Sequence, residues 1–169
     1  MNIEIEGVTI PITLEDIEGF ENKYKLELPQ DYKYFLLNHN GGMPKIRRFK
    51  TKNEKHVSSF KFIMPLTKDA KDENVKHNLE YCYLRFIFMK KMPDNMIPFG
   101  EDPREDILCL SIKGDDYGSV YYWDRENELV FKQPASECYH LIAKTFNEFL
   151  AGLRLSDDEL KLSPVIKKS

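Results

Sequence analysis

Apolar residues in the first forty positions follow one alternating pattern and then two helical ones. From residue 3 to residue 12, apolar and polar residues alternate around Gly7, which predicts one or two short strands. Apolar residues then recur at helical spacing from Leu14 to Tyr24, and Thr13 and Asp16 have the spacing of a capping box at the helix start. A second helix is predicted to begin at Leu28-Pro29 and to end at Asn40-Gly41-Gly42, because Pro favours the first turn and Gly tolerates positive φ.

The middle of the chain predicts several strands and one helix. Loose alternation over residues 45–64 indicates one or two strands around a basic connector at 50–56. The spacing over 71–91 favours a helix, although its second half, residues 84–89, fits a strand equally well. Further strands are predicted at 96–99, 107–112 and 119–123, and a turn is predicted at 115–118.

The last forty residues predict a return to helix. A short return strand is expected at 129–131 after a polar turn, followed by a long amphipathic helix from Ser136 to about Leu153. A further capping box is predicted at 156–159. Helices at both ends with strands between them predict an α+β fold, and 169 residues predict a single domain spanning 1–169.

Composition places the chain among ordinary globular proteins. Hydrophobic residues make up 41% of the sequence and aromatic residues 12%, which excludes a disordered or low-complexity chain. The most apolar stretch, residues 81–89, is far shorter than the roughly 20 residues of a membrane span, and the N-terminus does not resemble a signal peptide. We therefore expect a cytoplasmic protein without membrane contact. The three widely spaced cysteines predict buried thiols rather than a disulfide framework.

Charge is unevenly distributed although the net charge is only −3. Residues 1–32 and 101–128 each carry a net charge of −6, whereas residues 33–100 carry +8. This alternation predicts separate acidic and basic faces.

An ordered series of short motifs resembles the SUKH superfamily, which includes the Smi/Knr domain of yeast cell-wall regulators and many bacterial immunity proteins. The motifs run from about residue 13 to residue 153, leaving 154–169 as a C-terminal extension. In chain order they are Ile17 to Glu21, Leu28-Pro29-x-Asp31-Tyr32, Asn40-Gly41-Gly42, Ile97-Pro98-Phe99-Gly100, Ile107-Leu108-Cys109-Leu110, Gly118 to Asp124, and Phe146-x-x-Phe149-Leu150. One departure is the segment 102–106, where family members often carry a Gly-Gly-Asp turn and only Asp106 matches.

The resemblance implies a fold and a function. The fold is a mixed, mostly antiparallel sheet packed against helices from the N- and C-terminal parts of the chain. The implied bacterial function is immunity: a protein that binds and neutralises a cognate toxin domain, often a nuclease or another nucleic-acid-modifying enzyme, with no catalytic residues of its own. The alternative is an intracellular regulatory or scaffold module like the yeast relatives. A monomer or weak dimer is expected in either case.

The sequence offers little support for catalysis, a metal or a cofactor. The four histidines have no zinc-motif spacing, and no glycine-rich nucleotide-binding loop is present. Cys138 and His140 are close in sequence, but two residues apart on a helix they would face different directions. We therefore expect no enzyme activity, no metal site and no cofactor.

A basic segment, Lys45 to Lys61, together with Phe49, Phe60 and Phe62, could in principle bind phosphates and stack bases. The acidic composition of the whole chain argues against nucleic-acid binding, and a solvated strand edge guarded by lysines is the simpler interpretation.

The acidic residues around the strand 107–112 are the more informative charge cluster. An acidic surface could mimic phosphate and would speed the encounter with the basic cleft of a nucleic-acid-degrading toxin. Nearby tyrosines could serve as aromatic anchors, with Tyr122 facing away from Tyr121 and Trp123 on an alternating strand. The partner-binding residues predicted on this basis are Glu101, Asp102, Glu105, Asp106, Asp115, Asp116, Tyr117 and Tyr122. The two acidic groups flank opposite ends of the strand and meet only if neighbouring loops converge.

Overall fold

The computed structural model describes residues 3–67 and 77–155. Its helices are α1 (Leu14–Tyr24), α2 (Gln30–His39), α3 (Leu79–Phe88), α4 (Arg125–Leu129), α5 (Ala135–Cys138) and α6 (Phe146–Ala151). Its strands are β1 (Ile5–Thr9), β2 (Gly41–Pro44), β3 (Arg48–Lys50), β4 (Val57–Ser59), β5 (Phe62–Ile63), β6 (Met96–Glu101), β7 (Ile107–Ser111), β8 (Val120–Trp123) and β9 (Tyr139–Ala143). The expected α+β class is confirmed.

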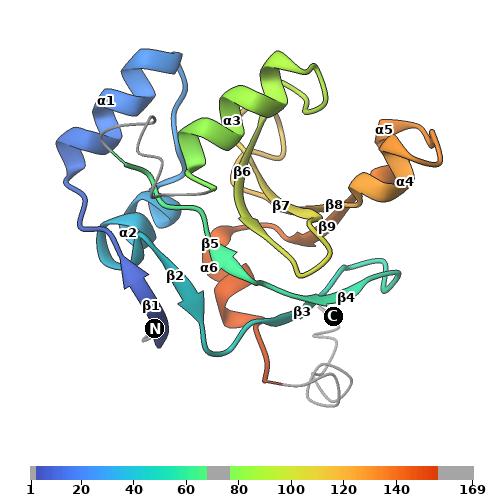
Figure 1. The fold of residues 1–169 in the computed structure, drawn as a ribbon, viewed down its shortest axis with the longest axis horizontal. Coiled ribbons are helices and arrows are strands. Elements are labelled where there is room, and N and C mark those ends of the chain that lie inside the picture. Colours follow the sequence, from blue (N-terminus) through green and yellow to red (C-terminus); the bar gives the residue numbers. More distant parts are fainter. Residues whose placement is uncertain (1–2, 68–76, 156–169) are drawn as a thin grey trace.

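An antiparallel five-stranded sheet in the order β5-β6-β7-β8-β9 forms the centre of the molecule. Two separate two-stranded antiparallel sheets lie beside it: β1-β2, whose strands are connected through α1 and α2, and the β3-β4 hairpin. Figure 1 shows α1, α2 and the β1-β2 pair on one side of the view, and α4 and α5 at the opposite side. Consecutive antiparallel strands explain why the central sheet needs only short connections between β6, β7 and β8.

Both faces of the central sheet are covered by aromatic side chains. On one face, the Phe99 ring lies 5.3 Å from Phe146 of α6 and 5.9 Å from Tyr32 of α2. On the other face, Trp123 contacts Phe86 of α3 at 5.3 Å and stacks on Tyr139 at 5.5 Å. Every residue of β6 and β7 is buried as a result. Trp123 is a core residue, and Tyr122 lies on the opposite face, as the strand alternation predicts.

The N-terminal helices follow the sequence closely. Thr13 caps α1 by accepting from the Asp16 amide at 3.2 Å, and the Asp16 carboxylate accepts from the Thr13 amide at 2.9 Å, so the predicted capping box is present. Pro29 directly precedes α2, and Gly41 and Gly42 after it have φ angles of 100° and 79°. The chain therefore turns at once from α2 into β2.

The predicted long helix from Ser136 to Leu153 is wrong. This segment contains the short helix α5, the strand β9 and the helix α6, because residues 139–143 pair with β8 and complete the sheet. A second helix start then appears at Thr145, whose side chain accepts from the Glu148 amide at 3.0 Å. The apolar residues of two different elements happened to have helical spacing, and strand pairing decided the structure.

Two smaller predictions are also settled. The return strand expected at 129–131 is wrong, because Asp124 caps the helix α4 instead and leaves Val130 and Phe131 exposed. The strand alternative for 84–89 is wrong, because most of this stretch belongs to α3. Residues 71–76 of the helix predicted there, and the capping box at 156–159, lie outside the described residues.

Truncating Phe99 to Ala should cost about 3–5 kcal/mol in the free energy of unfolding, because the ring fills the centre of the aromatic cluster. The matched variant Phe88→Ala removes a ring that is 90% exposed and should change stability by no more than about 0.5 kcal/mol. Urea unfolding followed by circular dichroism measures both values. Equal losses in the two variants would contradict this packing.

Candidate functional site

The predicted acidic residues form two groups that do not meet. Residues 101–106 precede β7 and residues 115–117 follow it, so the five-residue strand separates them by about 17 Å. The two groups must therefore be considered as separate sites.

The group before β7 is mostly interior, which corrects the prediction of an acidic surface there. Asp102 and Tyr122 are 0% exposed, and Glu101 and Asp106 are also buried; only Glu105 of this group is exposed. The physical reason is that the turn between β6 and β7 folds its carboxylates inward: Asp102 accepts from the backbone amides of Arg104 and Asp106 within this turn, and Tyr122 lies on a covered face of β8. Apart from Glu105, this group cannot form the outer face of a binding surface.

Asp102, Asp106 and Tyr122 instead form a buried hydrogen-bond network. The Tyr122 hydroxyl donates to Asp106 Oδ2 at 2.7 Å, lies 3.1 Å from Asp102 Oδ2, and accepts from Arg104 Nη2 at 2.7 Å. Asp102 also accepts from the Ser58 hydroxyl of β4 at 2.6 Å. Burial raises the pKa of Asp106, an effect that the Tyr122 hydrogen bond partly offsets. The network joins the β3-β4 hairpin to the central sheet.

Glu101, at the end of β6 where this strand pairs with the edge strand β5, makes a different set of contacts. Its carboxylate lies 3.6 Å from the Lys61 ammonium and 3.7 Å from His77 Nδ1. These contacts balance a buried carboxylate locally, so Glu101 takes no part in the Tyr122 network.

The group after β7 lies on the surface against the junction of α1 and α2. Tyr117 is 42% exposed and donates to the Glu27 carbonyl oxygen at 3.4 Å, and a Cβ added at Gly118, whose φ is 89°, would lie 3.9 Å from Pro29. Burial raises the pKa of the Tyr117 hydroxyl, and the nearby carboxylates of Glu27, Glu21 and Asp31 raise it further. Tyr117, which follows Asp115 and Asp116 directly in the chain, thus lies close to carboxylates of the first acidic block. We call this surface the acidic patch; it consists of Glu27, Asp31, Asp115, Asp116 and Tyr117.

Two members of the acidic patch also hold its structure. Asp116 accepts from the Ser111 hydroxyl and from the Tyr121 hydroxyl, each at 2.8 Å, and so closes the turn between β7 and β8. Asp31 accepts from the Asn147 amide at 3.0 Å. Asp115 and Glu27 are exposed, and their carboxylates hold none of these contacts, so substitutions of these two carboxylates should not disturb the turn.

A second cluster, which the sequence analysis missed, contains His56, Asp124 and His140. One ligand atom from each residue lies within 4.8 Å of the others. His56 Nε2 is 3.7 Å from Asp124 Oδ2, and the two imidazole rings are 4.3 Å apart. Burial lowers the pKa of both histidines and so favours their neutral form. The three residues come from distant segments, and no sequence spacing could have connected them.

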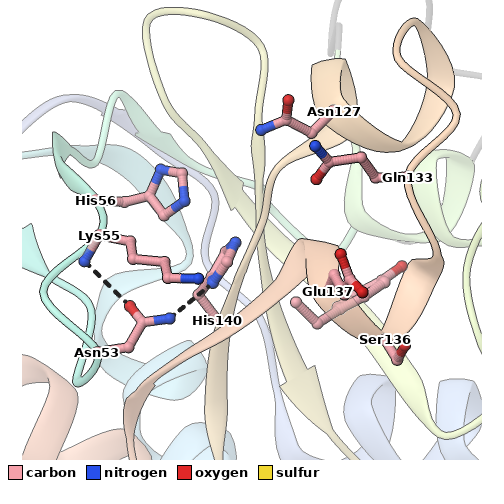
Figure 2. A pocket seen from close by; sticks show the side chains of 9 residues that line it. Asn53, Lys55, His56, Asn127, Gln133, Ser136, Glu137 and His140 are labelled. Carbon is pink, nitrogen blue, oxygen red and sulfur yellow. Dashed lines mark hydrogen bonds between the residues drawn. The ribbon is translucent and has the colours of Figure 1, made fainter.

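The two histidines lie at one end of a polar pocket of about 410 Å³. Figure 2 shows His56 and His140 beside Asn53 and Lys55, with Ser136 and Glu137 across the pocket. The lining residues are Asn53, Lys55, His56, Asn127, Gln133, Ser136, Glu137, Tyr139 and His140. Cys138 directly precedes β9, the strand that carries His140, but its side chain is buried. Burial raises the pKa of the Cys138 thiol, which opposes a nucleophilic role.

The basic segment Lys45 to Lys61 has no stacking surface of the kind that single-stranded nucleic acid requires. Phe49 and Phe60 are buried in the aromatic core. Three of its lysines make ion pairs with glutamates, Lys45 with Glu4, Lys50 with Glu54 and Lys52 with Glu148. The segment is a charged hairpin whose aromatic rings point inward.

The protein is thus an α+β domain with a five-stranded antiparallel sheet that is covered on both faces, and it carries two polar sites. A family model, the SMI1 / KNR4 family (SUKH-1), matches residues 11–152, and the chain belongs to this family. No curated protein matches the chain significantly. Within residues 3–67 and 77–155, no helix has the length and apolar character needed to cross a bilayer.

Replacing Tyr122 with Phe should lower the free energy of unfolding by about 1–3 kcal/mol, because Asp102, Asp106 and Arg104 lose a buried hydrogen-bond partner. Tyr34→Phe, which removes a hydroxyl from a largely exposed ring, serves as the control and should leave stability unchanged. Chemical denaturation at neutral pH measures the difference. A loss no larger than that of the control would show that the network contributes nothing.

Asp106→Asn should alter how stability depends on pH. Because burial raises the pKa of Asp106 in the folded chain, the unfolded chain loses this proton first, near its ordinary pKa of about 3.9. Wild type therefore loses a stabilising contribution as pH rises from about 4 through the raised folded pKa, and the Asn variant does not. The stability of the variant relative to wild type should improve over that window. A difference that stays constant with pH would contradict the raised pKa.

Proposed function

We propose that this protein is an immunity protein: it binds and neutralises a cognate bacterial toxin domain that attacks nucleic acid, by occlusion and without chemistry of its own. Membership of the SUKH-1 family supports a domain of this kind. The observation that carries the proposal is the acidic patch, where the exposed Tyr117, next to Asp115 and Asp116 in the chain, lies against acidic residues from a segment far away in the sequence.

The acidic patch has the chemistry expected of a surface that competes with a nucleic acid. A toxin that cleaves or modifies nucleic acid needs a basic cleft for phosphate, and carboxylates at an opposing surface attract that cleft over several ångströms. Such attraction mainly raises the association rate and selects the partner. An exposed tyrosine in the middle of the carboxylates offers a rigid aromatic anchor, one of the residue types that carry most binding energy.

The proposal includes the cytoplasm as the place of action, because this is where such a toxin meets its nucleic-acid substrate. We further propose that a monomer is the binding form and that a standard-size interface of roughly 800 Å² per partner forms around the patch. A regulatory or scaffold role like that of the yeast relatives is the alternative that the experiment below distinguishes.

Capture followed by growth rescue tests the proposed function. The tagged chain is used to capture proteins from its native lysate at low and at moderate salt, and each captured protein is produced alone in a bacterial host. The expected result is a captured domain that stops growth alone and no longer does so when this chain is produced with it. Captured proteins that are all harmless, or growth arrest that persists, would overturn immunity and favour the scaffold alternative.

Neutralising the two exposed carboxylates of the acidic patch, Asp115→Asn with Glu27→Gln, should slow association with the toxin about tenfold at low ionic strength and flatten its salt dependence. The matched control is Glu105→Gln, an exposed carboxylate at the other end of β7, which should keep the wild-type rate. Stopped-flow or surface-based kinetics at several salt concentrations measures both. An association rate that is the same in all three proteins would exclude the patch.

Tyr117→Ala should weaken the complex by at least about 2 kcal/mol, mainly through faster dissociation, because the ring is the only aromatic member of the patch as defined here. Tyr34→Ala, which removes a tyrosine ring on α2 that is 71% exposed, provides the control and should leave the affinity unchanged. Isothermal titration with the captured domain measures both affinities. Wild-type affinity in Tyr117→Ala would place the interface elsewhere.

A further inference from the structure

We propose that His56, Asp124 and His140 form a zinc site with an open coordination position facing the polar pocket. The three residues supply two imidazole nitrogens and one carboxylate oxygen, the ligand types that zinc takes from proteins. The site lies at the C-terminal end of β8, whereas the acidic patch lies before its start, so this proposal stands independently of the immunity function.

The spacing of the ligand atoms is close to what zinc requires. Zinc bonds of about 2.1 Å at tetrahedral angles place ligand atoms about 3.4 Å apart. His56 Nε2 and Asp124 Oδ2 are already 3.7 Å apart, and all three ligand atoms lie within 4.8 Å of one another. A small rotation of the imidazole rings therefore closes the site without moving the backbone.

The surroundings hold the three ligands in place. Asp124 is buried and accepts from the Asn127 amide at 3.1 Å, which fixes its carboxylate at the start of α4. The His56 ring packs 5.1 Å from Tyr122. Contacts of this kind, behind the ligands, orient metal-binding side chains in proteins. Asn53 Nδ2 donates to His140 Nδ1 at 3.0 Å, so zinc binding to His140 must exchange or rearrange this hydrogen bond.

Three protein ligands leave one position of a tetrahedral zinc ion for water or a small anion. The cluster opens into the pocket of about 410 Å³, whose lining is polar and includes Lys55, Ser136 and Gln133. The positive charge of the Lys55 ammonium opposes the charge of the metal. The positive charge of Lys55 favours an anion at the open coordination position. The same charge lowers the affinity of the site for zinc without an anion.

Zinc titration of the full-length protein, after removal of metal with a chelator, tests the site. We expect one zinc ion per chain by isothermal titration, and a loss of affinity of at least tenfold in His56→Gln, His140→Gln and Asp124→Asn. His39→Gln, a half-buried histidine that packs on Phe35, is the matched control and should bind like wild type. Absence of binding by wild type, or equal binding by all four variants, would overturn the proposal.

Two further readouts distinguish this site from a loose surface association. Cobalt in place of zinc should give the absorption of a tetrahedral nitrogen and oxygen site without a thiolate band, whereas a thiolate band would place the metal at a cysteine and overturn the site. Lys55→Gln should raise the zinc affinity several-fold, and Lys90→Gln, an exposed lysine that does not line the pocket, should leave it unchanged. Circular dichroism of each metal-free variant confirms that the fold is intact before titration.

Discussion

The carboxylate of Asp102 is the interaction on which the rest of the architecture depends. It is completely buried, and it accepts from the Ser58 hydroxyl, from the backbone amides of Arg104 and Asp106, and lies within reach of the Tyr122 hydroxyl. A buried carboxylate is costly unless several donors satisfy it, and here the donors come from β4, from the turn before β7 and from β8. One side chain thereby sets the position of the β3-β4 hairpin against the sheet, and with it the position of His56.

The two polar sites occupy opposite ends of β8, and each is assembled from segments that are distant in sequence. At one end, the turn before β8 lies on the α1-α2 junction and forms the acidic patch. At the other end, Asp124 meets His56 and His140 at the pocket. The shared strand is rigid because both of its faces are covered, so the two sites have a fixed relative position while remaining chemically separate.

Local signals in the sequence predicted the parts of the fold that local chemistry decides. The capping box at Thr13, the proline before α2 and the glycines after it need only neighbouring residues, and all three are present. The segment 136–153 could not be predicted in this way, because pairing of Tyr139–Ala143 with β8 outweighed an accidental helical spacing. Only the Thr145-x-x-Glu148 sequence signalled locally that a new helix begins there.

The candidate sites show the same division between local and tertiary information. Sequence correctly indicated two acidic blocks, but it could not show that Asp102, Asp106 and Tyr122 face each other inside the protein, since exposure depends on what covers a strand. Nor could it show that Glu27 approaches Tyr117, a contact across 90 residues. The histidine cluster joins positions 56, 124 and 140, and only the pairing of β8 with β9 and the hairpin docking bring them together.

The location of the acidic patch on connecting segments has an evolutionary consequence. Glu27 and Asp115 belong to the α1-α2 connection and the β7-β8 turn, outside the core and outside every strand ladder. Substitutions at such positions change the surface charge and shape at almost no cost in folding free energy. Under the proposed function, the binding surface can therefore change to fit another partner while the buried sheet, with its carboxylates and aromatic rings, keeps the fold.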